Sequence, residues 1–136
     1  MNAQQGLAAF ARSVALRLPA PIRFRLRKFR RGAAGSSERS AAEPLLSVVV
    51  VATDAESYLS ECLHSLRSQT LKRIEVLIVD NGSTDGTAAV AQQMASHDDR
   101  FTVLLHPRRG VTAARNAGAR VARGRFVTFV DATDTV

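Results

Sequence analysis

The sequence has 136 residues, which is enough for one domain of ordinary size and a tail. Its hydrophobic content of 46% is typical of a globular protein, and its single cysteine, Cys62, excludes an internal disulfide framework. The formal net charge of +7 raises the question of a nucleic-acid or membrane partner, so the position of the charges decides which class of function is favoured.

The excess positive charge lies in the first third of the chain. Residues 1–44 contain nine Arg and Lys residues against two acids, Glu38 and Glu43, which accounts for the whole net charge of +7. Residues 45–136 therefore carry ten basic and ten acidic side chains, with a net charge of zero. We name residues 1–44 the basic arm, and we expect a separate, electrically neutral domain over residues 45–136.

The basic arm has three competing interpretations. Residues 7–18 have apolar side chains at helical spacing and predict a short helix, residues 23–31 interleave arginine with phenylalanine and leucine, and residues 32–44 predict a flexible linker. The arm is a mostly disordered leader, an attachment of residues 12–31 to an anionic membrane face, or a nucleic-acid contact. The neutral domain disfavours nucleic acid, because all affinity for phosphate would rest on the arm. No apolar run in the arm approaches the about 20 residues that a membrane span needs.

The domain begins with a strand and a helix. Residues 45–52 are a near-continuous apolar, β-branched run, which is typical of a strand buried on both faces. Thr53 and Glu56 have the spacing of a capping box and predict that a helix starts there. On this helix the following apolar side chains recur at helical spacing and predict a buried face: Tyr58, Leu59, Cys62, Leu63 and Leu66.

The same alternation continues to the end of the chain. Residues 74–80, 101–105 and 126–131 predict three more strands, and residues 88–95 and 111–123 predict the helices between them. Strands that alternate with helices favour an α/β fold with a Rossmann-like parallel sheet and helices on both of its faces.

Short polar residues gather where the predicted strands end. In open parallel sheets, ligands bind outside the carboxyl ends of the strands. The loop after the second strand, residues 80–87, reads Asp-Asn-Gly-Ser-Thr-Asp-Gly-Thr, and its glycines allow a ligand to approach the backbone closely. No G-x-G-x-x-G fingerprint follows the first strand and no G-x-x-x-x-G-K-[ST] loop is present, which argues against a dinucleotide or P-loop enzyme.

Two long stretches carry a resemblance to a known family. "SVVVVATDAESYLSECLHSLRSQTLKRIEVLIVDNGSTDGT" and "GVTAARNAGARVARGRFVTFVD", together with the acidic strand at the end of the chain, resemble the family 2 glycosyltransferases. The resemblance covers about residues 45–136 and implies a nucleotide-sugar domain of the GT-A type. It implies transfer of a sugar from a nucleoside diphosphate donor to an acceptor, as in the synthesis of cell-envelope polysaccharides.

The resemblance also implies roles for individual residues. The nucleotide-sugar site would consist of Thr53, Glu56, Asp80, Asn81, Arg115 and Asp131. Thr53 and Glu56 would border the base, Asp80 and Asn81 would contact the base or the ribose, and Asp131 would face the ribose and the metal. Arg115 lies where the family has an arginine near the donor, although an arginine there is equally compatible with a simple role in the first turns of its helix.

A divalent cation is implied at the end of the last strand. Mg²⁺ or Mn²⁺ prefers oxygen ligands and would stabilise the charge on the leaving diphosphate, with Asp131 and Asp134 as its ligands. The sequence departs from the family here, because Thr133 stands where the acid that most directly binds the metal is expected. Thr53 also replaces an aromatic residue that would stack on the base.

Two expectations concern the protein as a whole. The family's catalytic base and acceptor pocket lie beyond the metal-binding strand, so we expect the base beyond Val136 and regard this chain as the donor-binding half. The alternative is a non-catalytic, degenerate or truncated module that binds nucleotide sugars or tethers a partner. We expect a cytoplasmic protein that associates peripherally with the inner face of the membrane through its arm.

Overall fold

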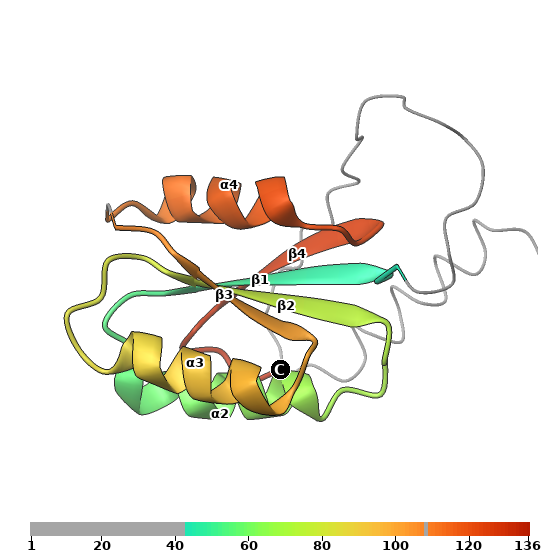
Figure 1. The fold of residues 1–136 in the computed structure, drawn as a ribbon, viewed down its shortest axis with the longest axis horizontal. Coiled ribbons are helices and arrows are strands. Elements are labelled where there is room, and N and C mark those ends of the chain that lie inside the picture. Colours follow the sequence, from blue (N-terminus) through green and yellow to red (C-terminus); the bar gives the residue numbers. More distant parts are fainter. Residues whose placement is uncertain (1–42, 108) are drawn as a thin grey trace, which may run out of the picture.

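The computed structural model describes residues 43–107 and 109–136 (Figure 1). The predictions for residues 1–42 of the basic arm lie outside these residues. The described chain alternates strands and helices in the predicted order: β1 (Leu46–Ala52), α2 (Glu56–Arg67), β2 (Ile74–Asp80), α3 (Thr87–His97), β3 (Phe101–Leu105), α4 (Val111–Val121) and β4 (Phe126–Asp131). The last helix ends two residues before the predicted end, because Ala122 already has an extended ψ of 128°.

The four strands form one parallel sheet in the order β3-β2-β1-β4. β1 lies in the centre, where Val50 is level with Ile78 of β2 and with Val130 of β4. Every residue of β1 and β2 is buried, as expected of apolar strands that helices cover on both faces. The predicted Rossmann-like architecture is therefore confirmed.

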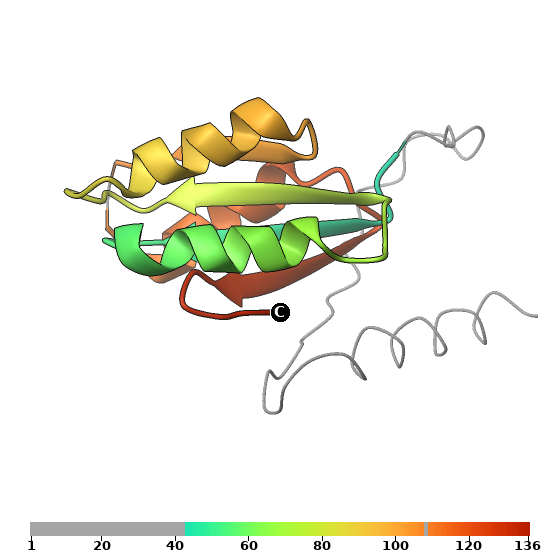
Figure 2. The same cartoon turned by 90° about the horizontal axis from the view of Figure 1, so that it is seen from below.

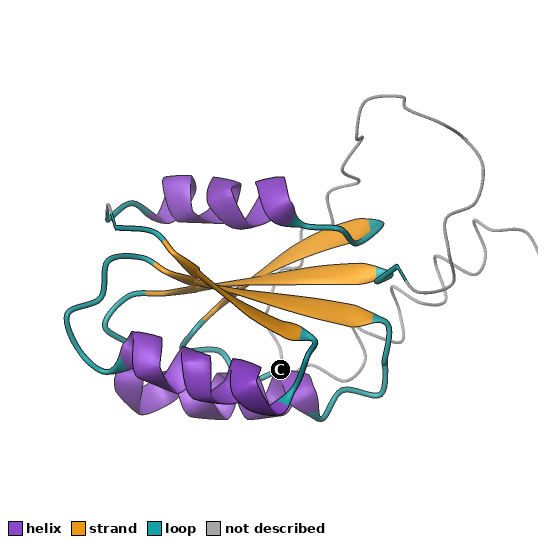
Figure 3. Ribbon diagram, in the orientation of Figure 1, coloured by secondary structure: helices purple, strands orange, loops and turns teal. Residues whose placement is uncertain are grey.

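Helices cover both faces of the sheet (Figure 3). α2 and α3 lie side by side on one face (Figure 2), and α4 lies alone on the other. Alternate residues of β1 point into the two resulting cores: Val48 and Val50 pack toward α2 and α3, whereas Val49 and Val51 pack toward α4. α4 approaches the sheet closely at Gly118, where an added Cβ would lie 2.4 Å from a methyl group of Val49.

The order of the strands reverses beside β1. The chain moves from β1 outward to β2 and β3, and then returns to place β4 on the other side of β1. The carboxyl ends of β1 and β4 therefore form a topological switch point, which is where open α/β sheets bind their ligands. The fold selects this position independently of any sequence motif.

At the opposite edge of the sheet, one buried carboxylate ties the strands to the turn before β4. Glu75 accepts hydrogen bonds from the Ser47 hydroxyl at 2.5 Å, from the Gly124 N–H at 3.1 Å, and from the backbone and side chain of Arg123. Burial would raise the pKa of this carboxyl, but the bonds from Ser47 and Arg123 outweigh burial and hold the pKa below its usual range.

The buried face of α2 is as predicted except at its start. Leu59, Cys62, Leu63 and Leu66 are buried, and burial raises the pKa of the Cys62 thiol to about 12. The prediction that Tyr58 belongs to this face was wrong, because its side chain is 59% exposed in the first turn of the helix. Within the described residues, none of the helices has the length and apolar content needed to cross a bilayer.

Candidate functional site

The tips of the three strands at the switch point lie next to one another. Ala52 is level with Asp80 across the β1–β2 pair, and Val51 is level with Asp131 across the β1–β4 pair. Residues that follow these positions leave the sheet at the same edge. The predicted site residues of strands one, two and four therefore share one surface.

Asn81 joins three segments at this surface. Its side-chain amide donates a hydrogen bond to the Thr53 hydroxyl at 2.9 Å, and its side-chain oxygen accepts one from the Gly110 N–H at 2.9 Å. Its own N–H donates to the Ala52 carbonyl at 2.8 Å, and the residue is 2% exposed. Because both ends of the amide are occupied within the protein, Asn81 positions Thr53 and the start of α4.

The loops after β1 and β2 cap each other's helices. The Asp85 carboxylate accepts from the Glu56 N–H at 3.2 Å at the start of α2, and the Glu56 carboxylate accepts from the Gly86 N–H at 2.9 Å at the start of α3. The Thr87 hydroxyl accepts from the Ala55 N–H at 2.8 Å. Carboxylates at both helix N-termini also complement the helix dipoles.

This exchange corrects one prediction. A capping box between Thr53 and Glu56 was expected, but the N-cap of α2 is Ala55, which makes no side-chain cap. The Glu56 carboxylate reaches across to the second loop instead, because α2 and α3 start at the same edge of the sheet. Its contact with Gly86 makes Glu56 a residue that fixes the loop geometry.

Asp54 and Arg109 form a second link across the same edge. Asp54 has a φ of 45° in the left-handed region, and its carboxylate accepts from the Thr84 N–H at 2.8 Å and from the Arg109 guanidinium at 2.5 Å. Arg109 also donates to the Gly82 carbonyl at 3.3 Å. The Thr84 backbone bond, together with Arg109, holds the pKa of Asp54 below its usual range. Sequence reasoning did not select this pair, since its members lie in different loops.

The fourth strand contributes an ion pair that faces solvent. A guanidinium nitrogen of Arg115 lies 3.1 Å from the Asp131 carboxylate, and the side chains are 41% and 56% exposed. The guanidinium also lies 5.9 Å from the centre of the Phe129 ring. The Arg115 Nε is buried and has no hydrogen-bond partner. The structure thus brings together two residues that the sequence assigned to the same site from different elements.

The acidic end of the chain folds into a turn. The Asp134 N–H donates to the Asp131 carbonyl at 2.9 Å, and the Asp134 carboxylate lies 3.3 Å from the Asp131 N–H, which donates to it. Thr133 is exposed and makes none of these bonds. Asp80, the remaining predicted residue, is 8% exposed and accepts from the Ser83 N–H at 3.2 Å.

The donor atoms in this turn fit a cation only if a ligand completes its shell. Among residues 43–107 and 109–136, no three His, Cys, Asp or Glu side chains gather as a metal site. Asp131 and Asp134 together provide two carboxylates, and Mg²⁺ commonly binds through one or two carboxylates with phosphates and water as its other ligands. The residues present therefore fit a cation that is shared with a diphosphate.

A shallow hollow of about 260 Å³ lies elsewhere, between α2 and α3. His64 and His97 both line it, and each donates from Nδ1 to a carbonyl of its own helix, those of Ser60 and Gln93, at 2.7 Å. None of the side chains that bridge the strand tips lines this hollow. The strand tips remain the candidate site.

Comparisons with known proteins identify the family of this chain. The profile described as "Glycosyl transferase family 2" matches residues 47–136. The chain is 40% identical over 93 residues to the putative glycosyltransferase EpsH of Bacillus subtilis (strain 168), an alignment that covers 68% of this chain and 27% of EpsH. The chain therefore spans about a quarter of the length of that relative.

Solved structures show the same fold. The mannosyltransferase PcManGT from Pyrobaculum calidifontis, in complex with GDP-Man and Mn²⁺, matches with a TM-score of 0.62 and 28% identity over 67% of this chain and 28% of that one. TarS 1-349 of S. aureus, in complex with UDP-GlcNAc, matches with a TM-score of 0.59 and 31% identity over 65% of this chain and 26% of that one.

Proposed function

This chain belongs to glycosyl transferase family 2, and we propose that it is the donor-binding part of an enzyme that transfers a sugar from a nucleoside diphosphate. The match of residues 47–136 supports the family, and the two structural neighbours are complexes with GDP-Man and with UDP-GlcNAc. The identity of this chain's donor and acceptor is part of the proposal. For the acceptor we expect a cell-envelope polysaccharide.

One observation carries the proposal: Thr53, Asn81, Arg115 and Asp131 lie on one surface at the switch point of the sheet. Asn81 contacts Thr53 directly, and Arg115 contacts Asp131 directly. The register places Asp131 level with Val51, two residues before Thr53. A nucleoside and its diphosphate together are long enough to contact several strand tips, which is the arrangement that open α/β sheets offer.

The residues divide into those that contact the donor and those that hold the loops. Thr53, Asp80 and Asp131 would accept or donate hydrogen bonds to the base and the ribose. Arg115, with its unpartnered Nε and partly exposed guanidinium, would bind the diphosphate. Asn81 fixes the tips, since its amide is already occupied.

A divalent cation would be held by Asp131 and Asp134 together with the diphosphate. Such an ion supplies charge stabilisation to the leaving group. Before it binds, Asp131 would have to give up its ion pair with Arg115, which the donor phosphates would then take over. Thr133, at the position of the third acid, contributes at most a neutral hydroxyl.

Calorimetry with the full chain tests the proposal. Sugars linked to UDP, GDP and CDP are titrated with and without Mn²⁺. We expect one of them to bind, and Asp131→Asn to weaken that binding by about 10- to 100-fold, since a hydrogen bond to a charged group contributes about 1.5–3 kcal/mol.

Asp99→Asn is the matched control for this experiment. Asp99 is exposed just before β3, at the opposite edge of the sheet, so the same change of charge there should leave the affinity unchanged. If none of the donors binds, with or without the metal, the proposal fails. If both variants weaken binding equally, the effect is one of net charge and the site assignment fails.

The alternative, a non-catalytic module for binding or tethering, is favoured by Thr133. Thr133→Asp adds the missing carboxylate in an exposed turn, where it should not disturb folding. If the site is that of an enzyme with a weakened metal position, this variant binds Mn²⁺ more tightly in the presence of the nucleotide. If the affinity for Mn²⁺ does not increase, the module is the better description.

We also propose that the protein is cytoplasmic and associates with an anionic membrane surface through residues 12–31 of the basic arm. The interleaved arginine and phenylalanine residues support this, since cations attract anionic headgroups and aromatic rings prefer the interface. Deletion of residues 1–44, followed by binding to vesicles and to RNA, separates a membrane partner from nucleic acid.

A further inference from the structure

The charges of the neutral domain are segregated onto two opposite edges of the sheet. At the carboxyl edge, the described residues of the strand ends and the loops after them include five acids, Asp54, Asp80, Asp85, Asp131 and Asp134, against one cation, Arg109. The segments that lead into the strands, residues 43–45, 68–73, 98–100 and 122–125, form the amino edge. They hold five cations against three acids.

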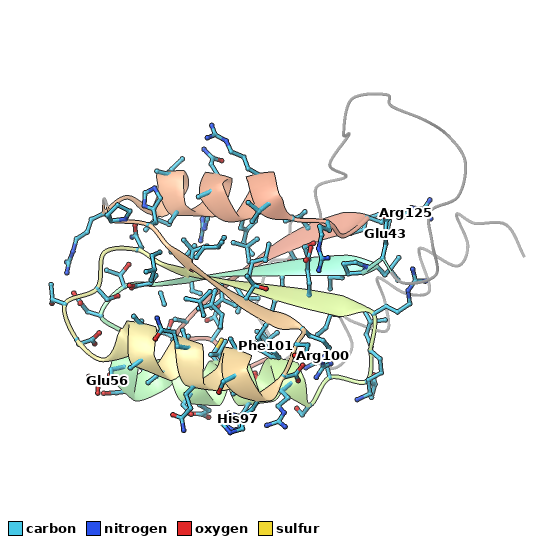
Figure 4. The ribbon with its side chains drawn as sticks, viewed as in Figure 1. Glu43, Glu56, His97, Arg100, Phe101 and Arg125 are labelled. Carbon is cyan, nitrogen blue, oxygen red and sulfur yellow. The ribbon has the colours of Figure 1, made fainter. Side chains whose placement is uncertain are left out.

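The cations of the amino edge occupy equivalent positions. Arg73, Arg100 and Arg125 each stand immediately before a strand, namely β2, β3 and β4. Because the strands are parallel, all their starts lie at the same edge of the sheet. The register places Arg73 and Arg125 level with Leu45 on either side of β1, whereas Arg100 is level with Glu75. Figure 4 shows Arg125 and Glu43 at this end of the sheet and Glu56 at the opposite end.

Three of these cations have no carboxylate partner among the described residues. Arg100 pairs with Asp98 at 2.7 Å, and Arg123 pairs with the buried Glu75 at 3.1 Å. The other three, Lys72, Arg73 and Arg125, are exposed and lie more than 4 Å from every described carboxylate oxygen.

The contacts of these three side chains leave their charge available. Lys72 donates to the Gln69 carbonyl at 3.4 Å and Arg73 to the Glu43 carbonyl at 2.9 Å, and both acceptors are backbone oxygens. The Arg125 guanidinium lies 5.8 Å from the centre of the Phe126 ring. Backbone carbonyls and an aromatic ring hold a guanidinium in place without neutralising it.

Two further features point to a lipid surface at this edge. Val121, the last residue of α4, is 46% exposed beside the turn that carries Arg123 and Arg125, so an apolar side chain accompanies the cations. The described chain also starts at this edge with Glu43, and residues 32–42 separate Glu43 from the arginine-rich residues 23–31 in the sequence. The strand tips of the candidate site lie at the other edge.

We propose that the amino edge of the sheet is a membrane-docking surface that binds anionic lipid headgroups through Lys72, Arg73 and Arg125. The surface adds to the basic arm a contact made by the folded domain itself. It holds the domain with its carboxyl edge, and so the candidate site, facing away from the bilayer. The inference does not depend on the proposed donor binding, because it uses none of the residues of that site.

Co-sedimentation of the full chain with vesicles of phosphatidylcholine, with and without phosphatidylserine, tests this surface. The triple variant Lys72→Gln, Arg73→Gln and Arg125→Gln removes three charges from the amino edge. Each cation near an anionic surface changes the partition constant about fivefold, so we expect a loss of about 100-fold on the phosphatidylserine vesicles. Binding to pure phosphatidylcholine should be weak for every variant.

The matched control lowers the net charge by the same amount at the other end. Ser57→Glu, Ala89→Glu and Thr112→Glu are exposed positions in the first turns of α2, α3 and α4, near the carboxyl edge. This variant should bind the anionic vesicles within a fewfold of the unmodified chain, because its added charges face away from the bilayer. Circular dichroism establishes that both variants are folded.

Three results would each contradict part of this proposal. If the amino-edge variant binds as well as the unmodified chain, the arm alone is responsible and the docking surface is refuted. If both variants lose affinity equally, the effect is one of net charge and the orientation is refuted. If the amino-edge variant loses more affinity for single-stranded RNA than for phosphatidylserine vesicles, the partner is a nucleic acid and the lipid assignment is wrong.

Discussion

Replacing Asn81 by alanine should loosen the carboxyl edge of the sheet as a whole. The Asn81 amide is the one described side chain that contacts Thr53 after β1 and Gly110 before α4 at once. Asn81→Ala removes both bonds and leaves the backbone of the strand unchanged. The donor N–H of Gly110 then has no side-chain partner, and the Thr53 hydroxyl loses its donor.

The size of the effect follows from the burial of the partners. A buried polar group that loses its partner costs about 1–3 kcal/mol. Thr53 and Gly110 are only half-buried, so water replaces part of each bond. The lower end of the range, about 1 kcal/mol, therefore applies to each of these two groups. We therefore expect Asn81→Ala to lower the free energy of unfolding by about 2 kcal/mol, a large share of the 5–15 kcal/mol typical of a domain.

Urea unfolding followed by far-UV circular dichroism measures this change, since the chain contains no tryptophan for fluorescence. Asn81→Asp keeps an acceptor for the Gly110 N–H, and the Thr53 hydroxyl can turn to donate to it, so this variant should lose less than half as much. Gln92→Ala, which removes an exposed amide from α3, should lose almost nothing. A free energy for Asn81→Ala within about 0.5 kcal/mol of the unmodified chain would refute the reasoning.

Three other changes test other parts of the structure. Glu75→Gln should lower the free energy of unfolding by about 3 kcal/mol near neutral pH, because the buried Ser47 hydroxyl and the part-buried backbone N–H groups of Arg123 and Gly124 lose a charged acceptor. The pKa of Glu75 is lower in the folded protein than in the unfolded chain. The difference in unfolding free energy between the unmodified chain and this variant, measured with urea, should therefore be largest above pH about 4.3. It should disappear as the pH falls through the lowered pKa. Gly118→Ala should lower the unfolding free energy by about 1–3 kcal/mol in thermal unfolding, because its Cβ would lie 2.4 Å from Val49. Arg109→Gln should lower the urea midpoint only slightly, since the ion pair with Asp54 is exposed, and high salt should remove the difference.

The secondary structure could be predicted from the sequence to within a few residues. The apolar runs at residues 46–52 and 74–80 are long, β-branched and uninterrupted, so their burial on both faces was readable without coordinates. The same reading failed at Tyr58. Its helical phase places it at the margin of the apolar stripe, next to Cys62, and phase alone does not show how wide a stripe the rest of the protein covers.

The candidate site, too, could be predicted only in part from the sequence. The chemical types at the strand ends follow from the sequence, and the family resemblance assigned Thr53, Asn81, Arg115 and Asp131 to one site. The resemblance did not show that each end of the Asn81 amide is hydrogen-bonded within the protein, or that Glu56 caps α3. These facts depend on which donors the second loop presents, and that loop lies 30 residues from Glu56 in the chain.

The sequence by itself determined the strands, the helices, the parallel sheet and the neutrality of the domain, because apolar periodicity and charge counts depend on residues close together in the chain. The tertiary structure alone decided which loops cap one another, that Asp54 meets Arg109 across 55 residues, and that opposite charges collect on opposite edges of the sheet. The reason is geometric: parallel strands bring all their starts to one side and all their ends to the other, so positions that are scattered along the chain become neighbours only after folding.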